Sequence, residues 1–92
     1  MMETRIINGC MGVKVRLPNA NLLILIGDKG YIMCGYLNLE AAEAKGEAAA
    51  VVSGVSTFSD MLKGEVKAAT SKAKELGVKQ GMSGESALEI LK

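Results

Sequence analysis

Cys34 is the residue of this chain that could most directly do chemistry, because a thiol can act as a nucleophile. It lies between two tyrosines in the segment Tyr31–Asn38. A reactive thiol needs a basic or cationic neighbour that favours the thiolate, and the sequence contains no histidine. The nearest cation, Lys29, lies across an expected turn. Because free cysteines are among the most buried residue types, we favour a buried structural thiol and expect Cys10 to be the more accessible cysteine.

A small-ligand site is predicted around the same segment. Gly35 would let a ligand or another backbone come close to the strand. Tyr36 carries a hydroxyl that can hydrogen-bond to a ligand or to a neighbouring subunit, and Asn38 lies where the strand meets the next helix. Packing and helix capping would explain these residues without any ligand. Ligand binding at Cys34, Gly35, Tyr36 and Asn38 is therefore a hypothesis that competes with a structural one.

A second candidate lies at Ser83 and Gly84, where the last expected helix opens. Free backbone N–H groups at a helix start can hold a phosphate or a carboxylate. Ser83 is also explained as a helix cap, and Glu85 already supplies negative charge there. The segment Gly27–Gly30 has two glycines but none of the further elements of a phosphate-binding loop. Anion binding at Ser83 and Gly84 therefore competes with simple capping.

The composition argues against several classes of function. Eleven Lys and Arg against ten Asp and Glu give a net charge of +1 without a basic cluster, so no nucleic-acid partner is expected. Two cysteines and no histidine predict no metal site, and nothing in the sequence calls for a cofactor. The apolar runs are far shorter than the ~20 residues that span a bilayer, so no membrane association is expected. Reduced thiols then predict a cytoplasmic protein.

The elements that must position these residues change character near Asn38. Residues 1–37 are expected to be β-rich, with Thr4–Ile7 paired to Val13–Leu17 and Leu22–Ile26 paired to Tyr31–Leu37. Asn8-Gly9, the dipeptide most favoured in tight hairpin turns, joins the first pair. Gly12 is expected to mark a bulge or a close backbone contact.

The run LLILI does not alternate, which indicates a strand covered on both faces. One face can lie on the chain's own helices. In so small a domain the other face needs a second sheet or a neighbouring subunit. The sequence therefore predicts a homo-oligomer, a dimer or a tetramer, whose interface contains Leu22, Leu23, Ile24, Leu25 and Ile26.

Residues 38–92 are expected to be mainly helical. Asn, Ser and Thr caps and Gly stops predict short helices at 39–45, 58–62 and 72–76 and a last one that opens within 81–86. Ala48–Val52 could be helix or buried strand, and we favour helix. Residues 65–69 predict one further short strand. The prediction is a single domain over 1–92, of α+β class, with N-terminal antiparallel β-hairpins packed against short C-terminal helices.

Several separated blocks of the sequence match a known family in order. They are LPNANLLILIGDKGYIMCGYLN, GEAAAVVSGV, FSDML and KELGVKQGMSGESALEIL. On these blocks the chain resembles the YunC-like family of small archaeal and bacterial proteins, a domain of unknown function. The resemblance implies an α+β fold whose N-terminal β region assembles subunits, described for the family as a tetramerisation region. It brings no activity, substrate or cofactor.

Two hypotheses for the function remain open at this stage. The first is an oligomeric module that binds a small molecule or a protein partner. The alternative is a small enzyme with an inter-subunit site that uses Cys34, Tyr36 or Asn38. The absence of histidine and of any nucleophile–base pair favours the first hypothesis.

Overall fold

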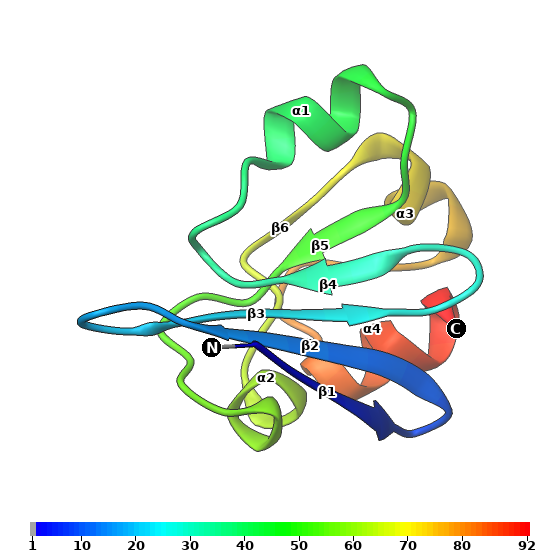
Figure 1. Cartoon of the computed structure of the whole chain (residues 1–92). Helices are drawn as coiled ribbons and strands as arrows, with labels where there is room; N and C mark the ends of the chain where they lie inside the picture. The colour runs from blue at the N-terminus through cyan, green and yellow to red at the C-terminus, as the bar shows by residue number, and fades with distance from the viewer. Residues whose placement is uncertain (1) are drawn as a thin grey trace.

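The computed structural model describes residues 2–92, in which a six-stranded mixed sheet is combined with short helices (Figure 1). The α+β class predicted from the sequence is confirmed. The elements in chain order are β1 (Met2–Ile7), β2 (Cys10–Arg16), β3 (Asn21–Ile26), β4 (Tyr31–Met33), α1 (Leu39–Ala44), β5 (Ala49–Val51), α2 (Phe58–Lys63), β6 (Ala68–Ala69), α3 (Ser71–Leu76) and α4 (Gly84–Leu91). The strands lie side by side in sequence order, from β1 at one edge to β6 at the other.

The first hairpin forms as predicted. Asn8 and Gly9 both have positive φ, 52° and 81°, as a two-residue type I′ turn requires. The ladder runs through Gly12 without an extra residue, so there is no bulge. A Cβ on Gly12 would lie 2.9 Å from the ring of Phe58, so the close approach at Gly12 comes from a side chain and not from the backbone that the sequence led us to expect.

The helix that we favoured for Ala48–Val52 is wrong, because this segment contains strand β5. After β4 the chain crosses over through α1 and returns so that β5 pairs parallel to β4. Ala49 is buried in the small cluster under α1, and Ala50 is buried in the main core on the opposite face. A strand covered on both faces shows no alternation, which is why the pattern resembled a helix.

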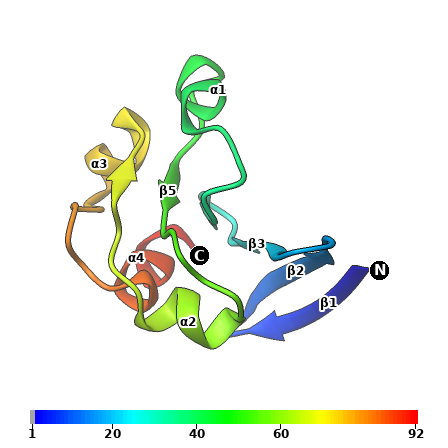
Figure 2. The same ribbon diagram turned by 90° about the vertical axis from the view of Figure 1, so that its left-hand side faces the viewer.

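The main core lies between one face of the sheet and the helices α2, α3 and α4 (Figure 2). Leu23, Leu25 and Ile32 of the sheet are fully buried there. The helices contribute Met61, Leu88 and Leu91, also fully buried. These short helices begin at N-caps of the residue types that the sequence predicts. The side chains of Asn38, Thr57, Thr70 and Ser83 accept hydrogen bonds from the first turns of α1, α2, α3 and α4.

The opposite face of the sheet is only partly covered. α1 stands apart from the other helices and packs on the β4–β5 end, where Met33, Ala42 and Ala49 form a small buried cluster (Figure 2). Over β1, β2 and β3 the cross-strand row Ile6, Met11 and Ile26 stays exposed, at 71%, 49% and 39%. We call this part of the sheet the open face. Alternation along the strands places these residues on it: Met2, Thr4, Ile6, Met11, Val13, Val15, Leu22, Ile24 and Ile26.

The short strand predicted within 65–69 is present as β6, and Glu65 adds an isolated bridge to Ser83. Two strands of the sheet, β5 and β6, therefore come from the half of the chain expected to be mainly helical. In residues 2–92 we find no helix with the length and apolar character needed to cross a membrane.

Candidate functional site

Cys34 lies just beyond the end of β4, and its sulfur completes the ladder between β3 and β4. The Cys34 N–H donates to the Leu23 carbonyl at 3.1 Å, and the Leu23 N–H donates back to Cys34 Sγ at 3.3 Å. The sulfur thus accepts a bond that a backbone carbonyl would normally accept. The Cys34 side chain is 2% exposed. This geometry assigns the thiol a structural role and buries it, as the sequence indicates.

A pocket of about 380 Å³ opens beside Cys34, where the chain leaves β4 and passes the loop before α2. It is lined by Ala20, Cys34, Gly35, Tyr36, Gly54, Val55 and Ser56. Its volume lies within the range of small-molecule sites. The lining is mostly apolar, with hydroxyls from Tyr36 and Ser56 and no charged side chain. Such a pocket suits a small neutral molecule and supplies no base to activate a thiol.

Three of the four residues predicted to bind a ligand, Cys34, Gly35 and Tyr36, therefore line one pocket. Asn38 does not join them. Its side chain caps α1, with Oδ1 accepting from the Glu40 N–H at 2.8 Å. It lines a separate groove of about 330 Å³ under α1. Capping accounts for Asn38 without a ligand.

The groove under α1 contains a strong polar contact that the sequence did not single out. The Tyr31 hydroxyl donates to Glu47 Oε1 at 2.6 Å. Burial, and then this hydrogen bond to the carboxylate, raise the pKa of Tyr31 to about 12. The phenol therefore stays protonated near neutral pH and acts here as a hydrogen-bond donor that joins β4 to the segment before β5.

The residues predicted to bind an anion are occupied by contacts within the chain. The Gly84 N–H donates to the Gly64 carbonyl at 2.8 Å, and a Cβ on Gly84 would lie against the Met61 carbonyl. Ser83 Oγ accepts from the Ser86 N–H at 3.1 Å. Close packing on α2 and capping of α4 account for both residues, and anion binding gains no support from these contacts.

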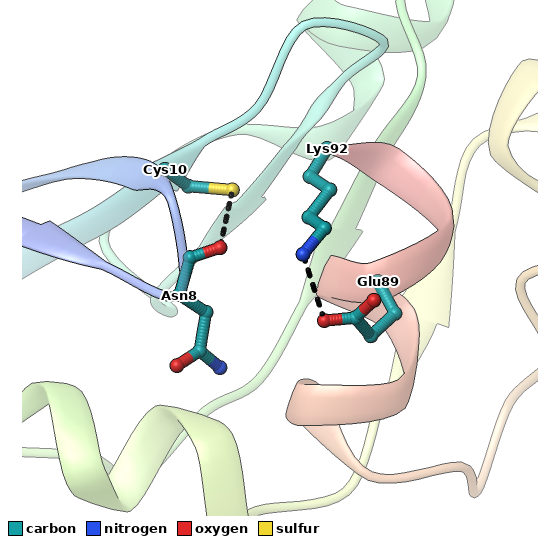
Figure 3. A network of polar contacts seen from close by, with 4 residues as sticks. All are labelled: Asn8, Cys10, Glu89 and Lys92. Atoms are coloured by element: carbon teal, nitrogen blue, oxygen red, sulfur yellow. Dashed lines mark hydrogen bonds and ion pairs between the residues drawn. The ribbon is translucent and has the colours of Figure 1, made fainter.

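Cys10 is as buried as Cys34, at 3% exposed, so the expected difference in accessibility is wrong. Its Sγ lies 3.9 Å from the Asn8 carbonyl, and burial raises the pKa of its thiol. Lys92, at the end of α4, faces the same gap and pairs with Glu89 at 3.1 Å (Figure 3). The first hairpin, the segment 26–28 and Lys92 thus line a pocket of about 560 Å³. No spacing in the sequence could reveal it, because its walls come from three separate segments of the chain.

The five residues of the predicted interface run divide between the two faces of β3. Leu23 and Leu25 are fully buried in the chain's own core and have no surface left for a partner. Leu22 is half-buried and packs against that core. Alternation places Leu22, Ile24 and Ile26 on the open face, so these three of the five residues remain available for the predicted interface. Within residues 2–92, no three Cys, Asp or Glu side chains gather closely enough to hold a metal ion.

Three similarities to known proteins agree with this fold. The family model described as "Domain of unknown function (DUF1805)" matches residues 33–91. The uncharacterized protein YunC of Bacillus subtilis (strain 168) is 39% identical over 80 residues, which cover 83% of this chain and 79% of that protein. The crystal structure of a protein of unknown function, TA1206 from Thermoplasma acidophilum, superposes with a TM-score of 0.89 at 36% identity, covering 100% of this chain and 92% of that one. The strands of the open face, β1 to β3, precede the part that the family model matches, yet the solved structure covers them as well.

Proposed function

The chain belongs to the DUF1805 family, a domain of unknown function, and we propose that it is a homo-oligomeric module. In this proposal it assembles through the open face and binds a small neutral molecule in the pocket beside Cys34. The two buried free cysteines fit a further part of the proposal, that the protein works in the reducing cytoplasm. The single observation that carries the proposal is the exposed apolar row Ile6, Met11 and Ile26.

The open face supports assembly because water-exposed apolar side chains are contiguous on it. Soluble monomers rarely leave a large apolar patch exposed, and such patches commonly mark contact sites between proteins. Val13 and Ile24 lie next to the exposed row and are half-buried, so the patch continues across the three strands. A second copy is the simplest partner, since the same apolar patch on two copies is self-complementary about a two-fold axis.

The pocket beside Cys34 supports binding rather than catalysis. Its lining side chains offer only the hydroxyls of Tyr36 and Ser56 as oxygen groups, and the sulfur of Cys34 already accepts the Leu23 N–H. A nucleophilic thiol requires a base or a cation, and none of the lining side chains is either. The lining therefore favours recognition by shape with one or two hydrogen bonds.

Assembly is tested by placing a charge on the open face. Met11→Lys should weaken self-association by about 2 kcal/mol per dimer, roughly thirtyfold, because each copy loses about half of a buried Met side chain. Leu76→Lys is the matched control, since Leu76 is 40% exposed at the end of α3 on the helix side of the molecule. Sedimentation velocity measures both variants. Equal behaviour of the two would overturn assembly through the open face.

A second variant, Ile24→Asp, probes the half-buried part of the same face. Its carboxylate would lose its water on assembly without gaining a partner, so we expect monomers. A thermal unfolding curve separates loss of assembly from loss of folding. A folded Ile24→Asp protein that keeps the mass of the unmodified oligomer would contradict the proposal.

Ligand binding is tested by filling the pocket. Ala20→Leu would project a larger side chain from the pocket wall, whereas Asn19→Leu changes the exposed neighbouring residue outside the lining. A panel of neutral metabolites is screened by thermal shift against the unmodified protein. A compound that stabilises the unmodified protein and Asn19→Leu but not Ala20→Leu supports binding in this pocket. A compound that stabilises all three equally places the site elsewhere.

A further inference from the structure

Strand β1 is a free edge of the sheet. Within the described chain it pairs with β2 alone, and no backbone hydrogen bond outside that ladder reaches it. It is six residues long, and Figure 1 shows it as the outermost strand. An edge strand of this length presents unpaired N–H and C=O groups to any other strand that can align with them.

The hairpin turn determines which residues present those groups. A type I′ turn brings Ile7 and Cys10 together as a hydrogen-bonded pair, and hydrogen-bonded pairs then alternate along an antiparallel ladder. Ile7, Arg5 and Glu3 therefore turn their backbone groups toward β2. Met2, Thr4 and Ile6 turn theirs to the free edge, with Thr4 in the middle.

The sequence of β1 is self-complementary about Thr4. If two copies of Met2–Ile6 run antiparallel with Thr4 opposite Thr4, each Glu3 faces Arg5 of the partner subunit and each Met2 faces Ile6 of the partner subunit. In this arrangement Thr4 and Thr4 of the partner subunit form a hydrogen-bonded pair, because the backbone N–H and C=O of Thr4 point to the free edge. The charge pattern, the apolar pattern and the backbone alternation thus agree on one register.

We propose that β1 pairs with β1 of a second copy in this register, so that two sheets join edge to edge about a two-fold axis through Thr4. The inference rests on the proposed homo-oligomer and adds a contact distinct from the open face. Cross-strand neighbours lie on the same side of a sheet, so the two open faces become one continuous surface. Packing two such surfaces together about a second two-fold axis would give a tetramer of D2 symmetry.

The charges of β1 distinguish this partner from others. Isolated charges on an edge strand discourage pairing with an unrelated strand. Here Glu3 and Arg5 carry opposite charges and lie one residue to either side of Thr4. Only an antiparallel copy in this register therefore places each of the two charges opposite one of the other sign. Within its own chain Glu3 also contacts Lys14, at 3.6 Å and with 43% of its side chain exposed, which leaves it accessible to a second cation.

A charge-swap experiment tests the pairing. Glu3→Arg and Arg5→Glu each place like charges opposite one another twice per dimer, and each should weaken the edge contact about tenfold. The double variant E3R/R5E restores opposite signs and should recover most of the affinity. Sedimentation velocity across a dilution series measures all three, with thermal unfolding to show that each is folded. Singles that assemble like the unmodified protein, or a double no better than the singles, would overturn the pairing.

A cysteine cross-link tests the register without changing any charge. Thr4→Cys places two thiols directly opposite, at the ~5.5 Å Cα separation that a disulfide accepts, and should give a covalent dimer under mild oxidation. Ile6→Cys is the control on the same strand and face, because its two copies would lie about 13 Å apart. Dimers from Ile6→Cys and none from Thr4→Cys would contradict the register. If the protein is an oligomer and no β1 variant changes its assembly, the edge contact is wrong and assembly through the open face still stands. If the unmodified protein is a monomer, both proposals are wrong.

Discussion

Removing the sulfur of Cys34 should destabilise the protein far more than removing that of Cys10. Both thiols are buried, at 2% and 3% exposed, so truncation to alanine costs each about 1 kcal/mol of packing. Cys34→Ala also leaves the buried Leu23 N–H without its acceptor, which costs about 1–3 kcal/mol more. Cys10→Ala adds nothing comparable, because the Cys10 Sγ contact to the Asn8 carbonyl is long, at 3.9 Å.

The expected free energies of unfolding therefore differ by about 1–3 kcal/mol between the two alanine variants. In a domain of this size each kcal/mol corresponds to about 4–8 °C in Tm, so thermal and urea unfolding resolve the difference. Cys34→Ser keeps an oxygen acceptor and should recover part of the loss.

Equal stabilities of Cys34→Ala and Cys10→Ala would refute the assignment of the Cys34 sulfur as a ladder acceptor. A serine variant no more stable than the alanine variant would also contradict it. In the unmodified protein both thiols should react slowly with Ellman's reagent when folded and normally after denaturation. Rapid labelling of folded Cys34 would revive the enzyme hypothesis.

Three further predictions follow from contacts that join the elements. Thr70→Val should lower the free energy of unfolding by about 2–4 kcal/mol, because the buried hydroxyl caps α3 and also bridges the Ala49 N–H and the Glu47 carbonyl. The matched Thr57→Val removes a single exposed cap bond and should lower it by only about 1 kcal/mol. Urea unfolding measures both variants. Gly84→Ala should give little folded protein by circular dichroism, since the added Cβ meets the backbone of α2. The pKa of Tyr31 is raised to about 12 from an ordinary 10.0, so the folded protein holds the phenol proton more tightly than the unfolded chain does. The stability that this proton contributes is complete below about pH 10 and is lost as the pH rises toward 12. Urea unfolding between pH 9 and 11.5 should therefore show a steeper loss in the unmodified protein than in Tyr31→Phe, and equal slopes would contradict it.

The hairpins and the helix caps could be predicted from the sequence because each depends on residues that are close in the chain. Asn8-Gly9 permits two positive φ angles in succession, and Thr57 and Thr70 each cap the helix that follows them directly. The apolar run in β3 predicts cover on both faces; the chain itself covers one face, and cover of the other by a second copy stays a prediction. Only the alternation seen in the structure separates the core residue Leu23 from Ile24 on the open face.

Contacts between distant segments could not be predicted in this way. β5 was missed because small, buried residues such as Ala49 and Ala50 carry the same pattern in a helix and in a parallel strand. Gly84 was interpreted as part of an anion site, yet it allows α4 to approach α2, a contact that no local pattern encodes. The burial of Cys10 depends in the same way on the main core, to which residues from distant parts of the chain contribute.

The central claim is that the chain assembles with further copies of itself. Sedimentation equilibrium of the unmodified protein at low micromolar concentration tests it most directly. The account predicts a mass of two or four times the 9.6 kDa of the chain, persisting on moderate dilution. A single species of 9.6 kDa across the whole concentration range would contradict it.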